Sequence, residues 1–119
     1  MTVPNNWCVE ANGTIYFGGT APVDEDNRVI APGKAGEQTR RILTRYRNVL
    51  EREGLQLGHL AFVTVYLKDL NDYAAMNAVY AEMMPGPYPA RKVVQAPMTL
   101  EGMVVEMTAV ATRERKRVL

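Results

Sequence analysis

Cysteine and histidine each occur only once in this chain of 119 residues. The single cysteine, Cys8, excludes an internal disulfide and suits a reducing compartment, so we expect a cytoplasmic protein. The single histidine, His59, cannot assemble a set of imidazole ligands. We therefore expect no metal site.

Long hydrophobic runs and a strong net charge are also missing. The longest apolar runs, residues 60–67 and 102–111, are too short to cross a bilayer. Residues 1–7 contain no basic start followed by an apolar stretch, so no secretory leader is expected. The formal net charge of +1 gives no electrostatic reason to expect a nucleic acid or an anionic membrane as partner.

What the chain does contain is the composition of an ordinary globular domain. Hydrophobic residues make up 47% and charged residues 23%, which is typical of soluble proteins. A chain of this length can build one hydrophobic core but not two. We expect a single domain over residues 1–119, with the basic segment 113–119 at its periphery.

The first half of the chain predicts a hairpin followed by a helix. Residues 7–11 and 14–18 flank Asn12-Gly13, a dipeptide that favours a tight two-residue turn. Apolar side chains at helical spacing then predict a helix over residues 34–53, and Gly54 is a natural stop. The apolar positions of this helix are Ile42, Leu43, Tyr46, Val49 and Leu50.

The second half predicts a strand, a helix and two further strands. Residues 60–67 are apolar at positions that point to both faces of a strand. This pattern indicates an interior strand covered on each side. A helix begins near Asn71 or Asp72, and strands follow over residues 90–96 and 102–112. The order β-β-α-β-α-β-β predicts an α+β fold with both helices on one face of a sheet. The other face needs cover, so we expect a homo-oligomer.

One arginine and one glutamate lie inside the last two predicted strands. Arg91 and Glu106 would come close together if these strands formed an antiparallel hairpin through residues 97–102. Such a pair is then either an ordinary cross-strand ion pair or part of a cleft. In a cleft, Arg91 binds a substrate carboxylate and Glu106 holds or activates a water molecule. Spacing alone does not choose between these two interpretations.

Several segments, in order and at matching spacing, resemble the Rid family of YjgF-type reactive intermediate deaminases. The resemblance covers nearly the whole chain and is carried by residues 18–23, 38–40, 63–67, 71–77, 88–91 and 105–106. It implies a chorismate-mutase-like α+β fold assembled as a homotrimer, with clefts between neighbouring subunits. It also implies hydrolysis of small enamines or imines, such as 2-aminoacrylate, to a 2-keto acid and ammonia without metal or organic cofactor.

The resemblance also implies roles for individual residues. Arg91 matches the family arginine that binds the substrate carboxylate, and Glu106 matches the glutamate associated with the hydrolytic water. Gly19 and Val93 match positions whose backbone lines the same pocket. The N-terminal tyrosine that reaches the pocket in the family is absent here, so Trp7 is expected either to line the pocket or to pack in the hairpin core.

The departures from the family pattern leave other functions open. The altered N-terminal segment allows a larger substrate, such as an amino-substituted acid of the aminomuconate type. A non-catalytic module that binds small carboxylates would need Arg91 but not Glu106. An RNA-binding or RNA-cleaving protein is disfavoured because the chain has no stripe of aromatic and basic residues. A chaperone-like holdase would not depend on Arg91.

Overall fold

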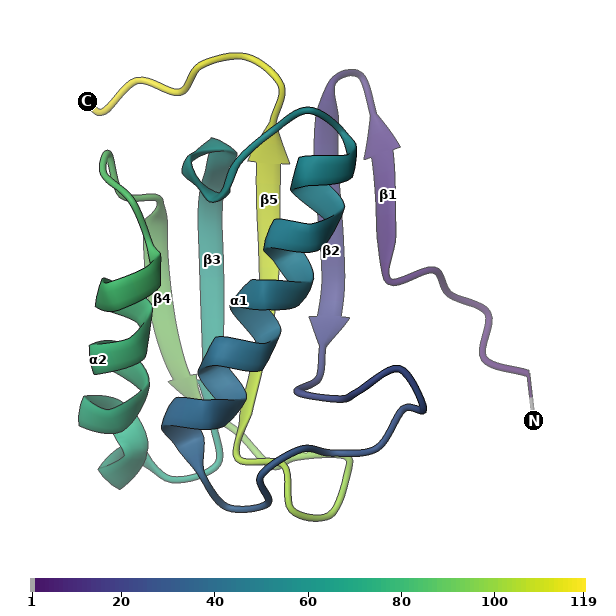
Figure 1. The fold of residues 1–119 in the computed structure, drawn as a ribbon, viewed down its shortest axis with the longest axis vertical. Helices are drawn as coiled ribbons and strands as arrows, with labels where there is room; N and C mark the ends of the chain where they lie inside the picture. The colour runs from purple at the N-terminus through teal and green to yellow at the C-terminus, as the bar shows by residue number, and fades with distance from the viewer. Residues whose placement is uncertain (1) are drawn as a thin grey trace.

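A five-stranded mixed sheet with two helices in front of it forms the body of the protein (Figure 1). The computed structural model describes residues 2–119. The strands are β1 (Cys8–Ala11), β2 (Thr14–Thr20), β3 (Leu60–Leu67), β4 (Ala90–Gln95) and β5 (Val105–Thr112). The helices are α1 (Ala35–Arg52) and α2 (Tyr73–Met83), and short 3-10 turns precede β3 and α2. The predicted order and the α+β class are confirmed.

The strands lie in the order β1-β2-β5-β3-β4. Only the β3–β4 pair is parallel, and the other three pairs are antiparallel. The predicted hairpin between the last two strands is therefore wrong, because β3 lies between β4 and β5. The physical reason lies in β3 itself: its apolar composition favours an interior position with neighbours on both edges. If β4 and β5 formed a hairpin, β3 would lose one of its two neighbouring strands.

The predicted N-terminal hairpin and first helix are confirmed. Asn12 and Gly13 both have positive φ, at 52° and 77°, which matches the right-handed twist of the two flanking strands. Helix α1 ends one residue before its C-cap, Glu53, and Gly54 follows at a φ of 75°. This left-handed conformation costs glycine little and stops the helix.

The core lies between the helices and one face of the sheet. Ile42, Leu43 and Leu50 of α1 are fully buried against it. Full burial of each such side chain contributes about 1.5–3 kcal/mol. From the sheet, the alternate residues Val63, Val65, Leu67, Val105 and Met107 meet them. Alternation along a strand sends every second side chain to the opposite face, and this decides where charged residues in the strands point.

The opposite face of the sheet carries large apolar side chains without cover from this chain. Val9, Tyr16 and Phe62 are 48%, 46% and 44% exposed. Within one chain β3 is thus covered on one face only, whereas its sequence predicted cover on both. We call this surface the open face. It is the surface for which a partner subunit was expected.

The C-terminal segment contacts the body of the protein. Arg113 forms ion pairs with Glu10 at 2.6 Å and Glu53 at 2.5 Å, and Lys116 donates a hydrogen bond to the Leu60 carbonyl. No helix within residues 2–119 combines the length and apolar character needed to cross a membrane.

Candidate active site

Gly19 and Glu106 lie together on the open face. The pairing of β2 with β5 shifts register between Phe17 and Thr20, so Gly18 and Gly19 form a bulge. A Cβ atom at Gly19 would lie 2.9 Å from Oε2 of Glu106, which is closer than van der Waals contact allows. The carboxylate of Glu106 therefore occupies space that only a glycine at position 19 leaves open.

The Glu106 carboxylate is half-buried and has no ionic partner. No Lys, Arg or His of residues 2–119 lies within ion-pairing distance of it. Burial raises the pKa of Glu106 above its ordinary value, because a low-dielectric environment disfavours the charged form. A carboxylate of this kind can take a proton from water more readily than an exposed one.

Arg91 lies on the helix-covered side of the sheet, next to α2. Its Nη2 donates a hydrogen bond to the hydroxyl of Tyr73 at 2.9 Å, and its guanidinium lies 4.6 Å from the ring centroid of Tyr80. Neither neighbour carries a negative charge. The planar fork of Arg91 thus keeps donors available for a carboxylate from outside the chain.

A cavity of about 300 Å³ opens beside Arg91. Its lining includes Asn77, Tyr80 and Tyr88. The Tyr80 hydroxyl is buried without a hydrogen-bond partner among residues 2–119, and burial raises the pKa of Tyr80 to about 12, opposed by the nearby Arg91. A neutral phenol of this kind offers a further donor near the arginine.

Arg91 and Glu106 do not meet within one chain. Arg91 pairs with Val63 of β3, whereas Glu106 pairs with Tyr66 of the same strand. Because Val63 and Tyr66 point to opposite faces, so do Arg91 and Glu106. Two strand spacings and three residues of register separate their Cα atoms by about 14 Å. The cross-strand ion pair that a hairpin would have allowed is therefore absent from the described residues.

The two other predicted pocket residues lie apart from Glu106. Val93 follows Arg91 on the same face of β4 and packs against the core. Trp7 precedes β1 and stacks on the helix side, with its ring centroid 5.5 Å from that of Phe17 and the guanidinium of Arg45 4.4 Å from its own. Within one chain, Gly19 and Glu106 form one cluster, Arg91 and Val93 a second, and Trp7 belongs to neither.

Gln38, to which the sequence pattern gave no role, holds together the loops beside the cluster of Gly19 and Glu106. Gln38 is fully buried. Its Nε2 donates to the carbonyls of Ile30, Ala31 and Gly102, and its Oε1 accepts from the backbone N–H groups of Val104 and Val105. A polar residue on the apolar side of a helix was the available signal, since a buried amide must satisfy its hydrogen bonds.

Comparison with known proteins places the chain in a family. The family model described as endoribonuclease L-PSP matches residues 3–113. A RutC family protein of Pyrococcus abyssi is 36% identical over 111 residues, which are 93% of this chain and 87% of that protein.

Solved structures agree with this match. RidA from a Psychrobacter species superposes with a TM-score of 0.83 at 26% identity, covering 94% of this chain and 90% of that one. The YjgF gene product of Escherichia coli gives a TM-score of 0.79 at 30% identity, covering 93% and 89%. The fold is thus that of the YjgF-type α+β proteins. The chain belongs to the endoribonuclease L-PSP family, which is the YjgF/Rid family.

Proposed function

We propose that this protein is a hydrolytic deaminase of small enamine or imine acids, giving a 2-keto acid and ammonia. The observation that carries the proposal is that Arg91 and Glu106, at positions that match the family motif, have no oppositely charged partner within the described residues. Arg91 has only neutral neighbours beside a cavity, and Glu106 is a half-buried carboxylate with a raised pKa. A substrate carboxylate and a water molecule complement these two groups.

The complete site requires two copies of the chain, because Arg91 and Glu106 lie on opposite faces of one sheet. The open face carries Glu106 together with exposed apolar side chains such as Tyr16 and Phe62. Packing this face against the β4 edge of a neighbour covers the apolar surface and brings a second chain's Arg91 toward Glu106. A closed ring of three chains, the homotrimer implied by the family, would contain three such sites.

The reaction itself needs water, a proton carrier and a fixed substrate. Arg91 holds the substrate carboxylate and so fixes the position of the imine carbon. Starting from the protonated imine, Glu106 accepts a proton from water as the water oxygen bonds to that carbon, and the π electrons of the C=N bond become the lone pair of an amine nitrogen. Glu106 then gives this proton to the nitrogen and the C–N bond breaks to release ammonia. The hydroxyl oxygen forms the carbonyl of the keto acid and loses its own proton to the Glu106 carboxylate.

The aromatic side chains near Arg91 favour substrates with an apolar side chain. Tyr80 and Tyr88 line the cavity, and Tyr73 bonds to the arginine. An apolar substrate side chain buries more surface against these aromatic rings than the small methylene group of 2-aminoacrylate does, and it therefore binds more favourably. A larger amino-substituted acid is therefore the second candidate substrate.

Release of keto acid from imines generated in situ by an amino acid oxidase or a dehydratase tests the proposal. We expect Glu106→Gln to lower kcat by about 10²-fold or more, the usual scale of general acid–base catalysis. Arg91→Ala should mainly raise KM, by about 10–100-fold, because it removes carboxylate binding.

Matched controls are the exposed residues Glu101 and Arg47, whose variants Glu101→Gln and Arg47→Ala should keep wild-type rates. A variant Glu106→Gln that binds keto acid and leaves every rate unchanged would instead indicate a carboxylate-binding module. Cleavage of an RNA oligonucleotide, lost in neither variant, would contradict the assigned site.

A further inference from the structure

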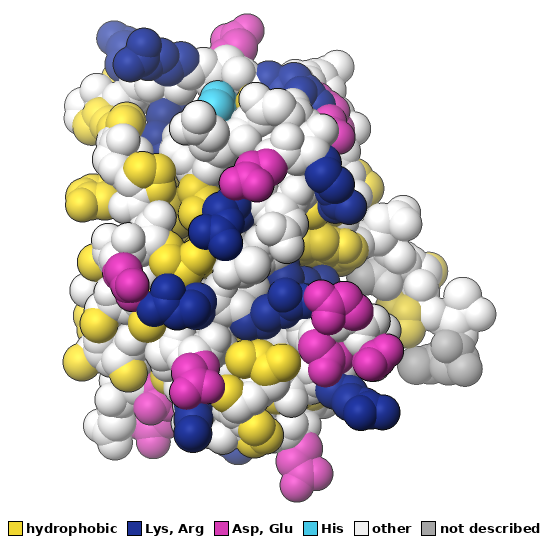
Figure 2. Space-filling model, viewed as in Figure 1, with side chains coloured by type: hydrophobic (Ala, Val, Ile, Leu, Met, Phe, Trp, Pro, Cys, Tyr) yellow, Lys and Arg dark blue, Asp and Glu magenta, His cyan; other side chains and the backbone are white. Residues whose placement is uncertain are grey.

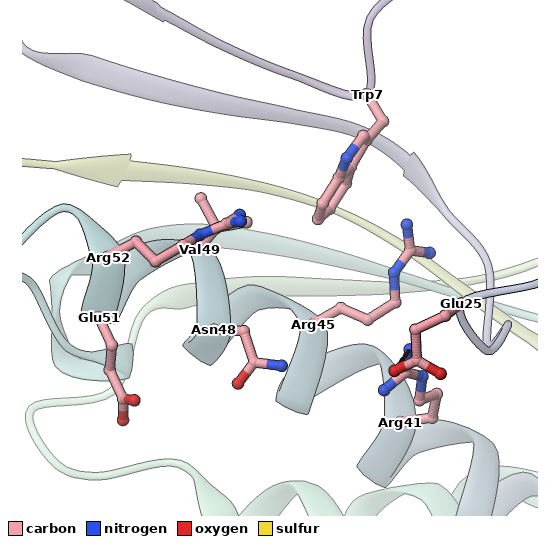
Figure 3. A pocket seen from close by; sticks show the side chains of 8 residues that line it. All are labelled: Trp7, Glu25, Arg41, Arg45, Asn48, Val49, Glu51 and Arg52. Carbon is pink, nitrogen blue, oxygen red and sulfur yellow. Dashed lines mark ion pairs between the residues drawn. The ribbon is translucent and has the colours of Figure 1, made fainter.

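A depression lies between α1 and the segment that precedes β1 (Figure 3). Its volume is about 680 Å³. The lining residues are Trp7, Glu25, Arg41, Arg45, Asn48, Val49, Glu51 and Arg52. Spacings of three and four residues place the α1 members on one side of that helix. None of them belongs to the Arg91 or Glu106 clusters.

Arg45 occupies the middle of this depression with only neutral partners. Its Nη1 donates to the Ala21 carbonyl at 2.6 Å, and its guanidinium lies over the ring of Trp7 (Figure 3). Burial and the neighbouring charge of Arg41 both lower the pKa of Arg45. The site therefore holds a partly desolvated cation that no carboxylate of the described residues pairs with, and such a cation favours binding of an anion.

The carboxylates around the depression do not neutralise its arginines. Glu25 approaches Arg41 at 3.7 Å but is 88% exposed, so this contact is weak. Glu51 points away from Trp7 (Figure 3). Within residues 2–119, Arg45 and Arg52 have no carboxylate in ion-pairing distance. Of the three arginines, only Arg41 thus has a carboxylate at ion-pairing distance, and that carboxylate is exposed.

We propose that this depression is a binding site for a small phosphate monoester. A dianionic phosphate has several acceptor oxygens and can bond to the remaining donors of Arg41 and Arg45, which are one helical turn apart, while Arg52 adds positive charge farther along α1. The indole of Trp7 provides an apolar wall for the organic part of the ligand.

The ligand is a small molecule rather than a polyanion. Basic and acidic side chains are interspersed across the middle of this face of the protein (Figure 2), and Glu25 and Glu51 stand at the rim of the depression. A nucleic acid running past the site would meet both carboxylates, whereas a single phosphate group would meet only Glu25, whose exposed side chain can turn away from Arg41.

Tryptophan fluorescence gives a direct readout, because Trp7 is the one tryptophan of the chain. Wild-type protein is titrated with glucose 6-phosphate at constant ionic strength, with glucose and sodium chloride as parallel titrants. We expect a saturable change with the phosphate ester alone. Calorimetry under the same conditions supplies a second readout that does not depend on the indole.

The arginine variants make the test specific to this site. Arg45→Gln should weaken binding by about tenfold or more, and Arg52→Gln, at an exposed position where folding is not at risk, by about threefold or more. Arg47→Gln removes the same charge from an exposed position outside the depression and should leave affinity unchanged. Deaminase activity is not needed for any of these measurements, so the site can be judged even if the proposed function is wrong.

Three results would overturn the proposal. The first is a signal that follows ionic strength and is matched by chloride. The second is equal binding by Arg45→Gln, Arg52→Gln and wild type in both readouts. The third is tighter binding of a short single-stranded RNA that Arg47→Gln weakens as much as Arg45→Gln, since this would indicate a diffuse polyanion surface.

Discussion

At the scale of single residues, Gly19 and Glu106 show the closest fit between backbone and side chain in the candidate site. The Cβ position of Gly19 is 2.9 Å from Oε2 of Glu106. A methyl group there moves the end of a flexible side chain rather than the backbone. The fold should therefore tolerate alanine at this position, while the carboxylate is displaced.

We predict that Gly19→Ala lowers kcat by about 10–100-fold, since a shift of about 1 Å in a catalytic group can cost this much. The measurement is imine hydrolysis together with a thermal melt to establish folding. Gly58→Ala is the control, because its nearest neighbour would be at 3.7 Å and its φ is not in the left-handed region. Full activity of Gly19→Ala would mean that the position of Glu106 does not limit the reaction.

The raised pKa of Glu106 predicts a characteristic pH dependence. The base must be ionised to accept a proton from water, and burial keeps Glu106 protonated at pH values where an ordinary glutamate is ionised. As pH falls, kcat/KM should therefore decline with a midpoint above about 4.3, the ordinary glutamate value. Rates measured across the acidic range check this. An identical acid limb in the residual activity of Glu106→Gln would assign the titration to another group.

At the scale of secondary-structure elements, the start of β5 depends on Gln38 of α1. Five backbone groups bond to this one buried amide. They belong to the loop before α1 and to the turn that leads into β5. Glu106 is the second residue of β5, so the amide fixes the strand that presents the carboxylate of the candidate site.

We predict that Gln38→Met destabilises the fold by about 2–4 kcal/mol, because buried carbonyl and N–H groups lose their partners. Urea unfolding at fixed protein concentration measures this difference. Gln95→Met is the matched control, since Gln95 is exposed and makes one long hydrogen bond of 3.4 Å. Its effect should stay within about 0.5 kcal/mol. Equal effects of the two substitutions would contradict a special role for Gln38.

The order of the strands was predictable only in part. The Asn12-Gly13 turn specified the first hairpin because few other dipeptides adopt its backbone angles. Strand β4 carried no such local signal about its neighbour. Its parallel pairing with β3 arises because α2 returns the chain across the sheet, and a crossover of this kind leaves strand order to tertiary packing.

At the scale of the whole molecule, the opposite orientation of Arg91 and Glu106 predicts complementation between two impaired variants, measured at a substrate concentration below the KM of Arg91→Ala. Each variant, Arg91→Ala or Glu106→Gln, carries one intact half of the site. If a site takes Arg91 from one chain and Glu106 from the next, random mixing of equal amounts rebuilds about one quarter of the sites, the product of two probabilities of one half.

Refolding the two variants together from denaturant and measuring imine hydrolysis tests this prediction. Each variant refolded alone is the control, and sedimentation establishes the assembly state in all three samples. No recovery in mixed assemblies would show that the reaction is completed within one chain, or that one of the two residues is not required.

What the sequence determined by itself was the local structure and the chemistry-bearing residues. Helical periodicity, the Asn12-Gly13 turn and Gly54 are short-range signals, and an arginine or glutamate within an apolar strand is conspicuous because burying an unpaired charge is costly. Whether Arg91 and Glu106 share a face was decided by tertiary structure alone. It depends on strand order and register, where a shift of one residue reverses the direction of every side chain, and these arise from packing between segments far apart in the chain.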